Sequence, residues 1–297
     1  MRVAITGAAG FVGSAVVRAC IEAGHEVHAI DNLSTGKEEN LPAGTALCMQ
    51  DAGFTDYSRV DAIVHCAAYA DISRNWTGLH ERERVWRAGP ELALRVLEHA
   101  PPQCRFVFLS SACVCPDEPR ETRATSFYAA SKVAGEALVQ AFHAAGRVRG
   151  TILRLVSAVG RNYWHGHIAD FVRMARDTGT IRARDDGSQR KSFVHVDDVG
   201  SGVVKALAEW DSNFAPLWNV SSPERWSWRD TVAVMRETRP VEVIAGDGRS
   251  AWIGDPVDLN VYGYGRRSVA AGVREALVSL GWRYSVDDPG AFAHEEP

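Results

Sequence analysis

Short apolar runs alternate with helix-like stretches along the first half of the chain. The runs are rich in Val, Ile, Phe and other apolar residues, and apolar positions recur at helical spacing between them. Strands that alternate with helices are typical of βαβ units, in which a parallel sheet carries helices on both faces. The pattern predicts strands over residues 2 to 7, 26 to 31, 45 to 50, 61 to 67, 105 to 110 and 151 to 156.

The helical stretches have recognisable ends. Residues 12 to 23 carry apolar positions at helical spacing and stop at Gly24, which suits the C-terminal cap of a helix. Residues 90 to 99 begin at Pro90, a residue favoured in the first turn of a helix. Residues 127 to 145 are rich in Ala, Leu and Val and predict one long helix. The C-terminal part of the chain gives weaker strand and helix signals.

Length and charge exclude several classes of protein. With 297 residues, 46% of them hydrophobic, the chain is long enough for two domains or for one domain with a large annex. A formal net charge of -4 gives no general attraction for nucleic acid, so no nucleic-acid partner is expected. No apolar stretch approaches the roughly 20 residues of a membrane span, and no signal-peptide core is visible. We therefore expect no membrane partner and a cytoplasmic location.

The cysteines and histidines give no pattern typical of a metal site. The six cysteines fall in the first 115 residues without regular spacing, so we expect reduced thiols rather than disulfides. Cys113 and Cys115 lack the two-residue gap of a zinc knuckle. No carboxylate or thiol cluster frames His165 and His167. The sequence therefore predicts no metal.

A glycine-rich turn is the first sign of a ligand. The segment TGAAGFVGS (6 to 14) follows an apolar strand and opens a helix, and its glycines at 7, 10 and 13 permit close backbone approach. Such a turn offers free amide N–H groups and the positive end of the helix dipole to a diphosphate. The next strand ends in Asp31, where a carboxylate can bind a ribose diol and repel a 2′-phosphate. The pattern predicts NAD rather than NADP, a preference that Lys37 nearby could soften; a tight turn without a ligand is the alternative.

Tyr128 and Lys132 are the first sign of catalysis. They stand four residues apart in SFYAASK (126 to 132). Positions i and i+4 of a helix lie on the same face, so the two side chains can act on one reacting atom. A motif this short also arises by chance, so the pair alone leaves its role open.

Together these motifs resemble the extended short-chain dehydrogenases, specifically the nucleotide-sugar epimerase and dehydratase group. The glycine spacing is similar, and YAASK resembles the active-site helix of that family. The resemblance covers most of the chain. Other similar segments are DNLSTGKEENL (31 to 41), VDAIVHCAA (60 to 68), FVFLSSACV (106 to 114), TILRLVSAVG (151 to 160), DDGSQRKSFVHVDDV (185 to 199) and SLGW (279 to 282).

The resemblance implies a catalytic set of Ser111, Tyr128 and Lys132. In the family the tyrosine takes a proton from a sugar hydroxyl while NAD takes the hydride from the same carbon. The lysine holds the nicotinamide ribose, and the serine shares a hydrogen bond with the reacting hydroxyl. A free tyrosine loses its proton only at about pH 10, so we expect Lys132 and the positive nicotinamide to lower the pKa of Tyr128.

Binding residues are implied in the same way. Asp51 matches the acid that reaches the adenine, and Lys191 stands where the family usually has an arginine, which keeps the charge and loses the bidentate fork. The full cofactor set is Gly7, Gly10, Phe11, Val12, Gly13, Asp31, Asn32, Ser34, Asp51, Ala52, Cys66, Ala67, Ala68, Tyr128 and Lys132. The substrate set is Arg74, Ser110, Ser111, Ser157, Lys191 and Arg249.

Departures from the family pattern fall on the substrate side. Residues 114 to 116 read Val-Cys-Pro where the family often has Val-Tyr-Gly, and Ser157 replaces the usual Asn. A 4,6-dehydratase uses an Asp-Glu pair after the catalytic Ser or Thr, and Ala112 and Cys113 stand at those two positions. We therefore exclude 4,6-dehydration and leave the identity of the sugar and of the nucleotide open.

The expected fold is α/β, a doubly wound parallel (Rossmann) sheet with a smaller C-terminal substrate-binding lobe. Residues 1–156, joined by 190–210, form the NAD-binding domain, and residues 157–189 and 211–297 form the lobe. The expected function is an NAD-dependent epimerase that acts on a nucleotide sugar, most naturally at C4, in carbohydrate metabolism.

Several alternatives stay open. One is an NAD(P)-dependent reductase or dehydrogenase of a nucleotide-linked keto sugar, which would consume the cofactor stoichiometrically. Another is a decarboxylase that oxidises C4 of a uronic acid. A third is a catalytically silent NAD-binding sensor, although the usual mark of such a protein is a broken Tyr-x-x-x-Lys motif. The family commonly dimerises through two helices, and those at 79 to 99 and 127 to 145 are the candidates here.

Overall fold

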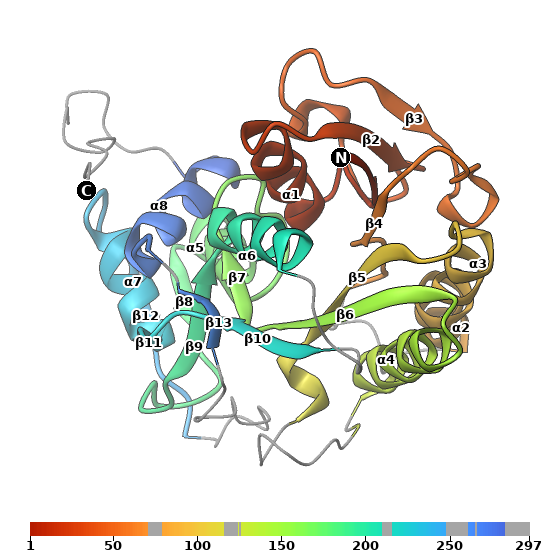
Figure 1. Cartoon of the computed structure of the whole chain (residues 1–297). Helices are drawn as coiled ribbons and strands as arrows, with labels where there is room; N and C mark the ends of the chain where they lie inside the picture. The colour runs from red at the N-terminus through yellow and green to blue at the C-terminus, as the bar shows by residue number, and fades with distance from the viewer. Residues whose placement is uncertain are drawn as a thin grey trace.

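An eight-stranded parallel sheet forms the centre of the described part of the chain (Figure 1). The computed structural model describes residues 1–70, 79–115, 124, 126–209, 216–247, 261–264 and 266–282. The strand order is β13-β10-β6-β5-β4-β1-β2-β3, and six of these strands follow the 3-2-1-4-5-6 order of dinucleotide-binding sheets. The strands are β1 (Arg2–Thr6), β2 (Glu26–Asp31), β3 (Leu47–Met49), β4 (Ala62–His65), β5 (Cys104–Ser111), β6 (Val148–Leu155), β10 (Leu217–Ser221) and β13 (Val261–Tyr264).

Helices cover both faces of this sheet. On one face α1 (Phe11–Glu22) and α6 (Val196–Ala208) pack against each other and share an apolar core with the strands. On the other face lie α2 (Leu79–Trp86), α3 (Leu92–His99) and α4 (Phe127–Ala144). Because both faces are covered, strand residues are apolar without alternation, and Val3, Ala4 and Ile5 of β1 are all fully buried. The predicted α/β doubly wound fold is confirmed.

A second, smaller set of elements packs beside the C-terminal ends of the strands. It holds a sheet of β7 (Ser157–Val159), β9 (Lys191–His195) and β11 (Arg225–Trp226), and a strand pair of β8 (Thr180–Arg182) and β12 (Glu242–Ile244). Three helices complete it: α5 (His167–Thr178), α7 (Trp228–Arg236) and α8 (Val269–Ser279). A separate apolar core that includes Phe171, Phe193 and Trp282 holds these elements together.

The predicted strands and two of the predicted helices lie where the sequence pattern indicates. The π-helical turn Arg87–Glu91 lies between α2 and α3, and the chain kinks within it at Gly89, which departs from helical geometry with φ of -108° and ψ of -106°. Helical geometry resumes at Pro90, where the sequence predicts a helix to begin. A proline at the start of a helical stretch has no N–H to donate, so no helical hydrogen bond is lost there.

Two strands of the large sheet come from the range that the sequence assigns to the lobe. Strand β10 extends the sheet beyond β6, with Leu217 beside Ile152, and β13 pairs with β10. The free edge of β6 needs a hydrogen-bonding partner, and a later segment supplies it. The division into two domains stays a proposal, in which β10 and β13 belong with the sheet.

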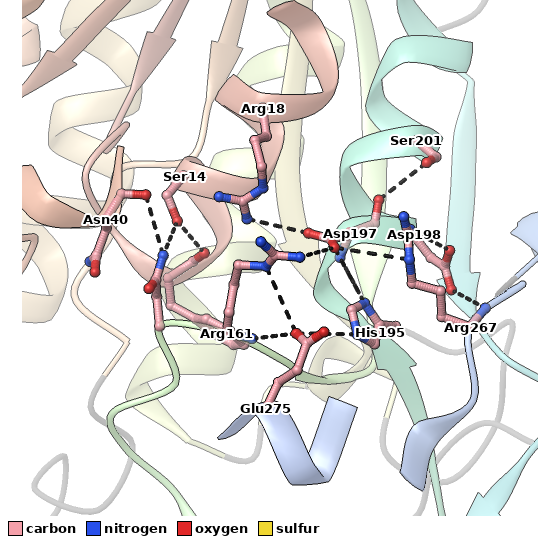
Figure 2. A network of polar contacts seen from close by, with 12 residues as sticks. Ser14, Arg18, Asn40, Arg161, His195, Asp197, Asp198, Ser201, Arg267 and Glu275 are labelled. Carbon is pink, nitrogen blue, oxygen red and sulfur yellow. Dashed lines mark hydrogen bonds and ion pairs between the residues drawn. The ribbon is translucent and has the colours of Figure 1, made fainter. Parts of the chain in front are cut away.

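A polar network joins α1 to the smaller set of elements (Figure 2). Asp197, at the start of α6, lies 3.3 Å from an Nη2 atom of both Arg18 and Arg161. Glu275 of α8 accepts a hydrogen bond from the backbone N–H of Arg161 and lies 3.4 Å from Nε2 of the buried His195. Three segments distant in sequence are thus held against the helix that follows the glycine-rich turn.

No helix among the described residues is long and apolar enough to cross a membrane.

Candidate active site

The glycine-rich turn has a backbone that side chains would obstruct. Gly7 has φ of +66°, and a Cβ atom there would lie 2.7 Å from the backbone nitrogen of Ala67. A Cβ atom at Gly13 would collide with the carbonyl oxygen of Gly7. Gly10 caps α1 without a side-chain hydrogen bond, so the first N–H groups of the helix are available to an anion. This cradle fits the diphosphate of a dinucleotide.

Asp31 ends β2 beside this turn. Its Oδ2 atom accepts a hydrogen bond of 2.9 Å from the N–H of Ala9, and its Oδ1 atom accepts one of 2.8 Å from the N–H of Leu33. The residue is 8% exposed. A carboxylate oxygen has more than one acceptor site, so Asp31 can hold the turn and still accept a hydrogen bond from a ribose hydroxyl.

One cavity of about 410 Å³ brings most of the predicted site residues together. It lies at the C-terminal ends of the strands, where doubly wound folds bind their ligands. The predicted residues that line it are Gly7, Gly10, Phe11, Val12, Gly13, Asp31, Asn32, Ser34, Asp51, Ala52, Cys66, Ala67, Ala68, Ser110, Tyr128 and Lys132.

Helix α4 positions Tyr128 and Lys132. The helix begins after Ser126, whose Oγ accepts a hydrogen bond from the N–H of Ala129, so the tyrosine lies in the first turn. The Nζ atom of Lys132 lies 5.8 Å from the centre of the Tyr128 ring and donates a hydrogen bond of 2.8 Å to the carbonyl oxygen of Leu109. Both side chains line the cavity, as their spacing predicts.

Burial changes the acidity of both groups. It lowers the pKa of Lys132 to about 8, against the opposing effect of Cys113, Cys66 and Glu136. It also raises the pKa of Tyr128; Cys113 adds to this rise, and a hydrogen bond with Ser111 opposes it. Without bound NAD the pKa of Tyr128 is therefore raised rather than lowered as expected, because the effect of burial exceeds that of the hydrogen bond with Ser111.

The two neighbouring serines have different surroundings. The Ser110 hydroxyl is 3% exposed and donates a hydrogen bond of 2.5 Å to Oε1 of Glu136. Ser111 is half-buried, accepts a hydrogen bond from the N–H of Cys113 and also bonds with Tyr128. The contact with Tyr128 fits the catalytic role that the resemblance gives to Ser111. Ser110 lines the cavity while its hydroxyl is engaged in a buried network.

That network contains an ion pair that the sequence analysis does not identify. Arg154 of β6 donates hydrogen bonds from Nε (2.8 Å) and Nη2 (2.6 Å) to the two carboxylate oxygens of Glu136, and from Nη1 (2.9 Å) to Sγ of Cys115. Glu136 and Arg154 are 4% and 6% exposed. A charged residue within the apolar strand sequence TILRLV was the available signal, because a buried charge requires a partner.

Of the predicted substrate residues that the structure describes, Ser110 lines this cavity, and Ser111, Ser157 and Lys191 do not. Ser157 begins β7 and Lys191 begins the neighbouring strand β9; both are half-buried, and neither lines the cavity. Lys191 lies near His167, whose pKa is lowered to about 4 by burial and, to a smaller extent, by that lysine. Arg74 and Arg249 lie outside the described residues.

Several cavity residues are absent from the sequence-based set. Arg84 and Arg87 come from the end of α2 and the π-helical turn, and Trp164 and His165 come from the segment before α5. Nothing local in the sequence connects these residues with the glycine-rich turn. Tertiary folding alone brings them to the cavity.

In the part of the chain that the structure describes, the cysteines and the potential metal ligands form no disulfide and no metal site. All six cysteines are free, as expected. Burial raises the pKa of Cys113, the thiol near Tyr128, so it is a neutral group at neutral pH. No group of three His, Cys, Asp or Glu side chains among the described residues could hold a metal ion.

Comparison with known proteins extends over nearly the whole chain. Residues 3–220 match the NAD dependent epimerase/dehydratase family. A UDP-glucose 4-epimerase of Corynebacterium glutamicum is 25% identical over 333 residues, which cover 98% of this chain and 95% of the relative. A crystal structure of UDP-galactose 4-epimerase has a TM-score of 0.78 at 25% identity and covers 95% of this chain and 99% of its own. A UDP-glucuronic acid 4-epimerase from Bacillus cereus, solved with UDP-glucuronic acid and NAD, has a TM-score of 0.80 at 19% identity, with the same coverage.

Proposed function

Because the chain belongs to the NAD dependent epimerase/dehydratase family, and NAD is therefore its cofactor, we propose that it is a nucleotide-sugar epimerase that inverts C4 of its substrate. One observation carries the proposal: Tyr128 and Lys132 lie one helical turn apart and line the same cavity as the phosphate-binding turn. A proton acceptor therefore lies beside the site that holds the hydride carrier. The near full-length similarity to a UDP-glucose 4-epimerase supports C4 as the reacting centre.

The chain's own residues handle the proton. Bound NAD would supply the redox chemistry: it would accept a hydride from the sugar carbon and return it to the opposite face of the resulting ketone, which inverts that carbon. Tyr128 takes the proton of the hydroxyl on that carbon and gives it back when the hydride returns. Ser111 holds the hydroxyl through a hydrogen bond and fixes its direction toward the tyrosine.

Lys132 supplies the positive charge that Tyr128 needs. Burial alone keeps the phenol protonated, so the tyrosine becomes a base only when positive charge lies close to it. The pKa of Lys132, about 8, leaves the lysine mostly protonated at neutral pH. With its ammonium fixed on the Leu109 carbonyl, Lys132 favours the phenolate and also stands where a nicotinamide ribose hydroxyl can reach it.

The two residues after Ser111 argue against 4,6-dehydration. That reaction needs an acid and a base beside the sugar ring, and the corresponding positions are Ala112 and Cys113. Alanine transfers no proton, and the Cys113 thiol has a raised pKa in its buried position. The proposal therefore retains oxidation and return of the hydride, without elimination of water.

We also propose a cytoplasmic homodimer. The free thiols fit a reducing compartment, because disulfides form and persist in oxidising ones. Helices α2, α3 and α4 lie together on one face of the sheet, and Phe127 at the start of α4 is 45% exposed. A twofold contact between these helices in two copies would bury that apolar surface.

The direct test is to incubate the purified protein with a catalytic amount of NAD and a panel of UDP-, dTDP- and GDP-sugars and uronic acids. NMR follows the sugar, and absorbance follows NADH. A new C4 epimer without net NADH supports the proposal. Stoichiometric NADH, or release of carbon dioxide from a uronic acid, would replace it with the dehydrogenase or decarboxylase alternative.

The matched variant is Tyr128→Phe, which removes the hydroxyl and keeps the ring. Loss of a positioned acid-base group should lower the rate by about 10²- to 10⁴-fold while the affinity for NADH stays near that of the wild type. A Tyr128→Phe variant that epimerises at the wild-type rate would remove the tyrosine from the mechanism.

A further inference from the structure

The segment between β7 and α5 has a fixed shape. Asn162 has φ of +66°, a left-handed conformation that Asn adopts more readily than most residues. Gly166 has φ of +95°, and a Cβ atom there would lie 2.5 Å from the hydroxyl oxygen of Tyr163. These two positions bound a compact turn, which leads directly into α5. Residues 163 to 165 are therefore presented in one arrangement.

Asn162 anchors this turn to α1 and α8. Its backbone N–H donates to Oγ of Ser279 (2.9 Å), and its Nδ2 atom donates to Oγ of Ser14 (3.1 Å) and to the carbonyl oxygen of Asn40 (3.3 Å). The preceding residue, Arg161, is held by the network around Asp197 and Glu275, in which Ser14 and Asn40 also lie (Figure 2). Ser14 belongs to the first turn of α1, so the anchor lies beside the phosphate-binding turn.

The anchored turn directs its aromatic residues toward the cofactor cavity. Tyr163 is 7% exposed and meets Phe11, the first residue of α1, edge to face at 5.4 Å between ring centres. Phe11, Trp164 and His165 all line the cavity. Trp164 is 40% exposed, lies 4.4 Å from the His165 ring, and its indole N–H has no hydrogen-bond acceptor among the described residues.

We propose that Trp164 and His165 are cofactor-binding residues that the second lobe contributes, and that they cover the diphosphate and nicotinamide-ribose half of NAD. Their place in the cavity argues for this half. The turn contacts Phe11 at the start of α1, where the diphosphate is expected, and the cavity also includes Leu155, which pairs with Ser111 across the sheet. The adenosine residues, Asp31 and Asp51, belong to the ends of other strands.

The chemistry of the two side chains suits this half of the cofactor. An indole N–H donates only, so it matches an acceptor such as a phosphate or ribose oxygen. The flat faces of indole and imidazole exclude water from the reacting carbon and pack against another ring. This inference rests on NAD being the cofactor and is independent of the sugar and of C4 as the reacting centre.

The test measures NADH affinity by fluorescence titration of the full-length protein. Trp164→Ala should weaken NADH binding about three- to tenfold, the effect of losing one aromatic contact. Trp86→Ala is the matched control, because Trp86 is 54% exposed on α2 and does not line the cavity; its affinity should equal that of the wild type. An unchanged affinity in a folded Trp164→Ala variant would overturn the inference.

A second variant tests the anchor. Asn162→Gly keeps the left-handed backbone and removes the two hydrogen bonds of the side chain, so it should also weaken NADH binding. A weakening in Asn162→Gly without one in Trp164→Ala would assign the effect to α1 and contradict the role of Trp164. The epimerase assay on the wild type is a separate test. An unchanged NADH affinity in Trp164→Ala would leave the proposed epimerase function intact. A wild-type protein that does not epimerise any sugar of the panel would leave the contact between Trp164 and the cofactor intact.

Discussion

Burial lowers the pKa of Lys132 from 10.5 to about 8, which brings its titration close to working pH. The proposed role requires the ammonium form, because only the charged group favours the Tyr128 phenolate. We therefore expect kcat/KM to fall as the pH rises through about 8. The measurement is the pH profile of kcat/KM, which reports the groups of the free enzyme.

Lys132→Arg is the control for that profile. A guanidinium stays protonated throughout this range, so the decrease above about pH 8 should disappear even where the rate itself is lower. A wild-type profile that stays flat through pH 8, or a Lys132→Arg profile with the same decrease, would show that another group controls the rate.

The positions of the cavity residues differ in how far the sequence predicts them. Tyr128, Lys132 and the three glycines of the turn were predictable, because helical spacing and a strand-to-helix turn place them locally. Trp164 reaches the cavity only through the packing of the segment between β7 and α5 on α1, which no local pattern encodes. The raised pKa of Tyr128 was also not predictable, since it depends on how deeply the fold buries the ring.

At the scale of single elements, the first turn of α1 depends on Gly13. A methyl group there would collide with the Gly7 carbonyl oxygen, so Gly13→Ala should displace the phosphate-binding turn. We expect NADH affinity to fall by at least about tenfold, the equivalent of roughly 1.4 kcal/mol. Gly202→Ala in α6 is the control, because a Cβ atom there would make only ordinary contact with Val220, at 3.6 Å. The substitution also replaces a glycine, which destabilises a helix interior, by alanine. Equal NADH affinities in the two variants would contradict the role of the glycine-rich turn in binding the diphosphate.

The ion pair between α4 and β6 gives a prediction for stability. Removing one member of a buried pair leaves an uncompensated charge, so Glu136→Ala or Arg154→Ala should each lower the free energy of unfolding by about 3–5 kcal/mol. The double variant Glu136→Ala/Arg154→Ala removes both charges and should be less destabilised than the sum of the single losses. Urea unfolding measures all of them. Additive losses would mean that the two residues do not act as a pair.

Element positions were predictable where the pattern is local. The ends of α1 and α4 follow from Gly24 and from the cap at Ser126, and the six N-terminal strands lie on their apolar runs. The helix start at Pro90 was predictable in the same way, because the chain kinks at Gly89 and helical geometry resumes at the proline. Strand β13 was not predicted, since its pairing with β10 depends on a partner distant in sequence.

For the molecule as a whole, two histidines held neutral give a prediction for acid stability. Burial lowers the pKa of His65 to about 3 and that of His167 to about 4, from 6.5. Below pH 6.5 the unfolded chain binds protons on these residues and the folded chain does not, so stability is lost as the pH falls toward 4. The loss is about 1.4 kcal/mol per pH unit for each histidine.

Urea unfolding across this range measures the effect. The decrease should begin near pH 6.5, above the range in which ordinary carboxylates titrate. His167→Phe, in a site beside Phe171 and Phe193, should remove about half of the slope. A free energy of unfolding that is constant between pH 6.5 and 5 would contradict the neutral, buried state of both histidines.

The arrangement of the elements was predictable only in outline. The βαβ pattern and the glycine-rich turn indicate the sheet, and the return of the chain near residue 200 appears as α6 packed on α1. The network around Asp197 and Glu275 was not predictable, because its members come from α1, α6, α8 and the segment after β7. That network and the Asn162 turn hold α8 and the segment after β7 against α1, beside the cofactor cavity.

In the proposed reaction one hydride leaves C4 of a nucleotide sugar and returns to the same carbon. The most direct measurement supplies the nucleotide sugar that reacts in the panel with deuterium at C4, together with catalytic NAD, and follows both epimers by NMR. We predict that deuterium stays at C4 in substrate and product and that no NADH accumulates. Exchange of the label with solvent, or its release in reduced cofactor in proportion to product, would contradict it.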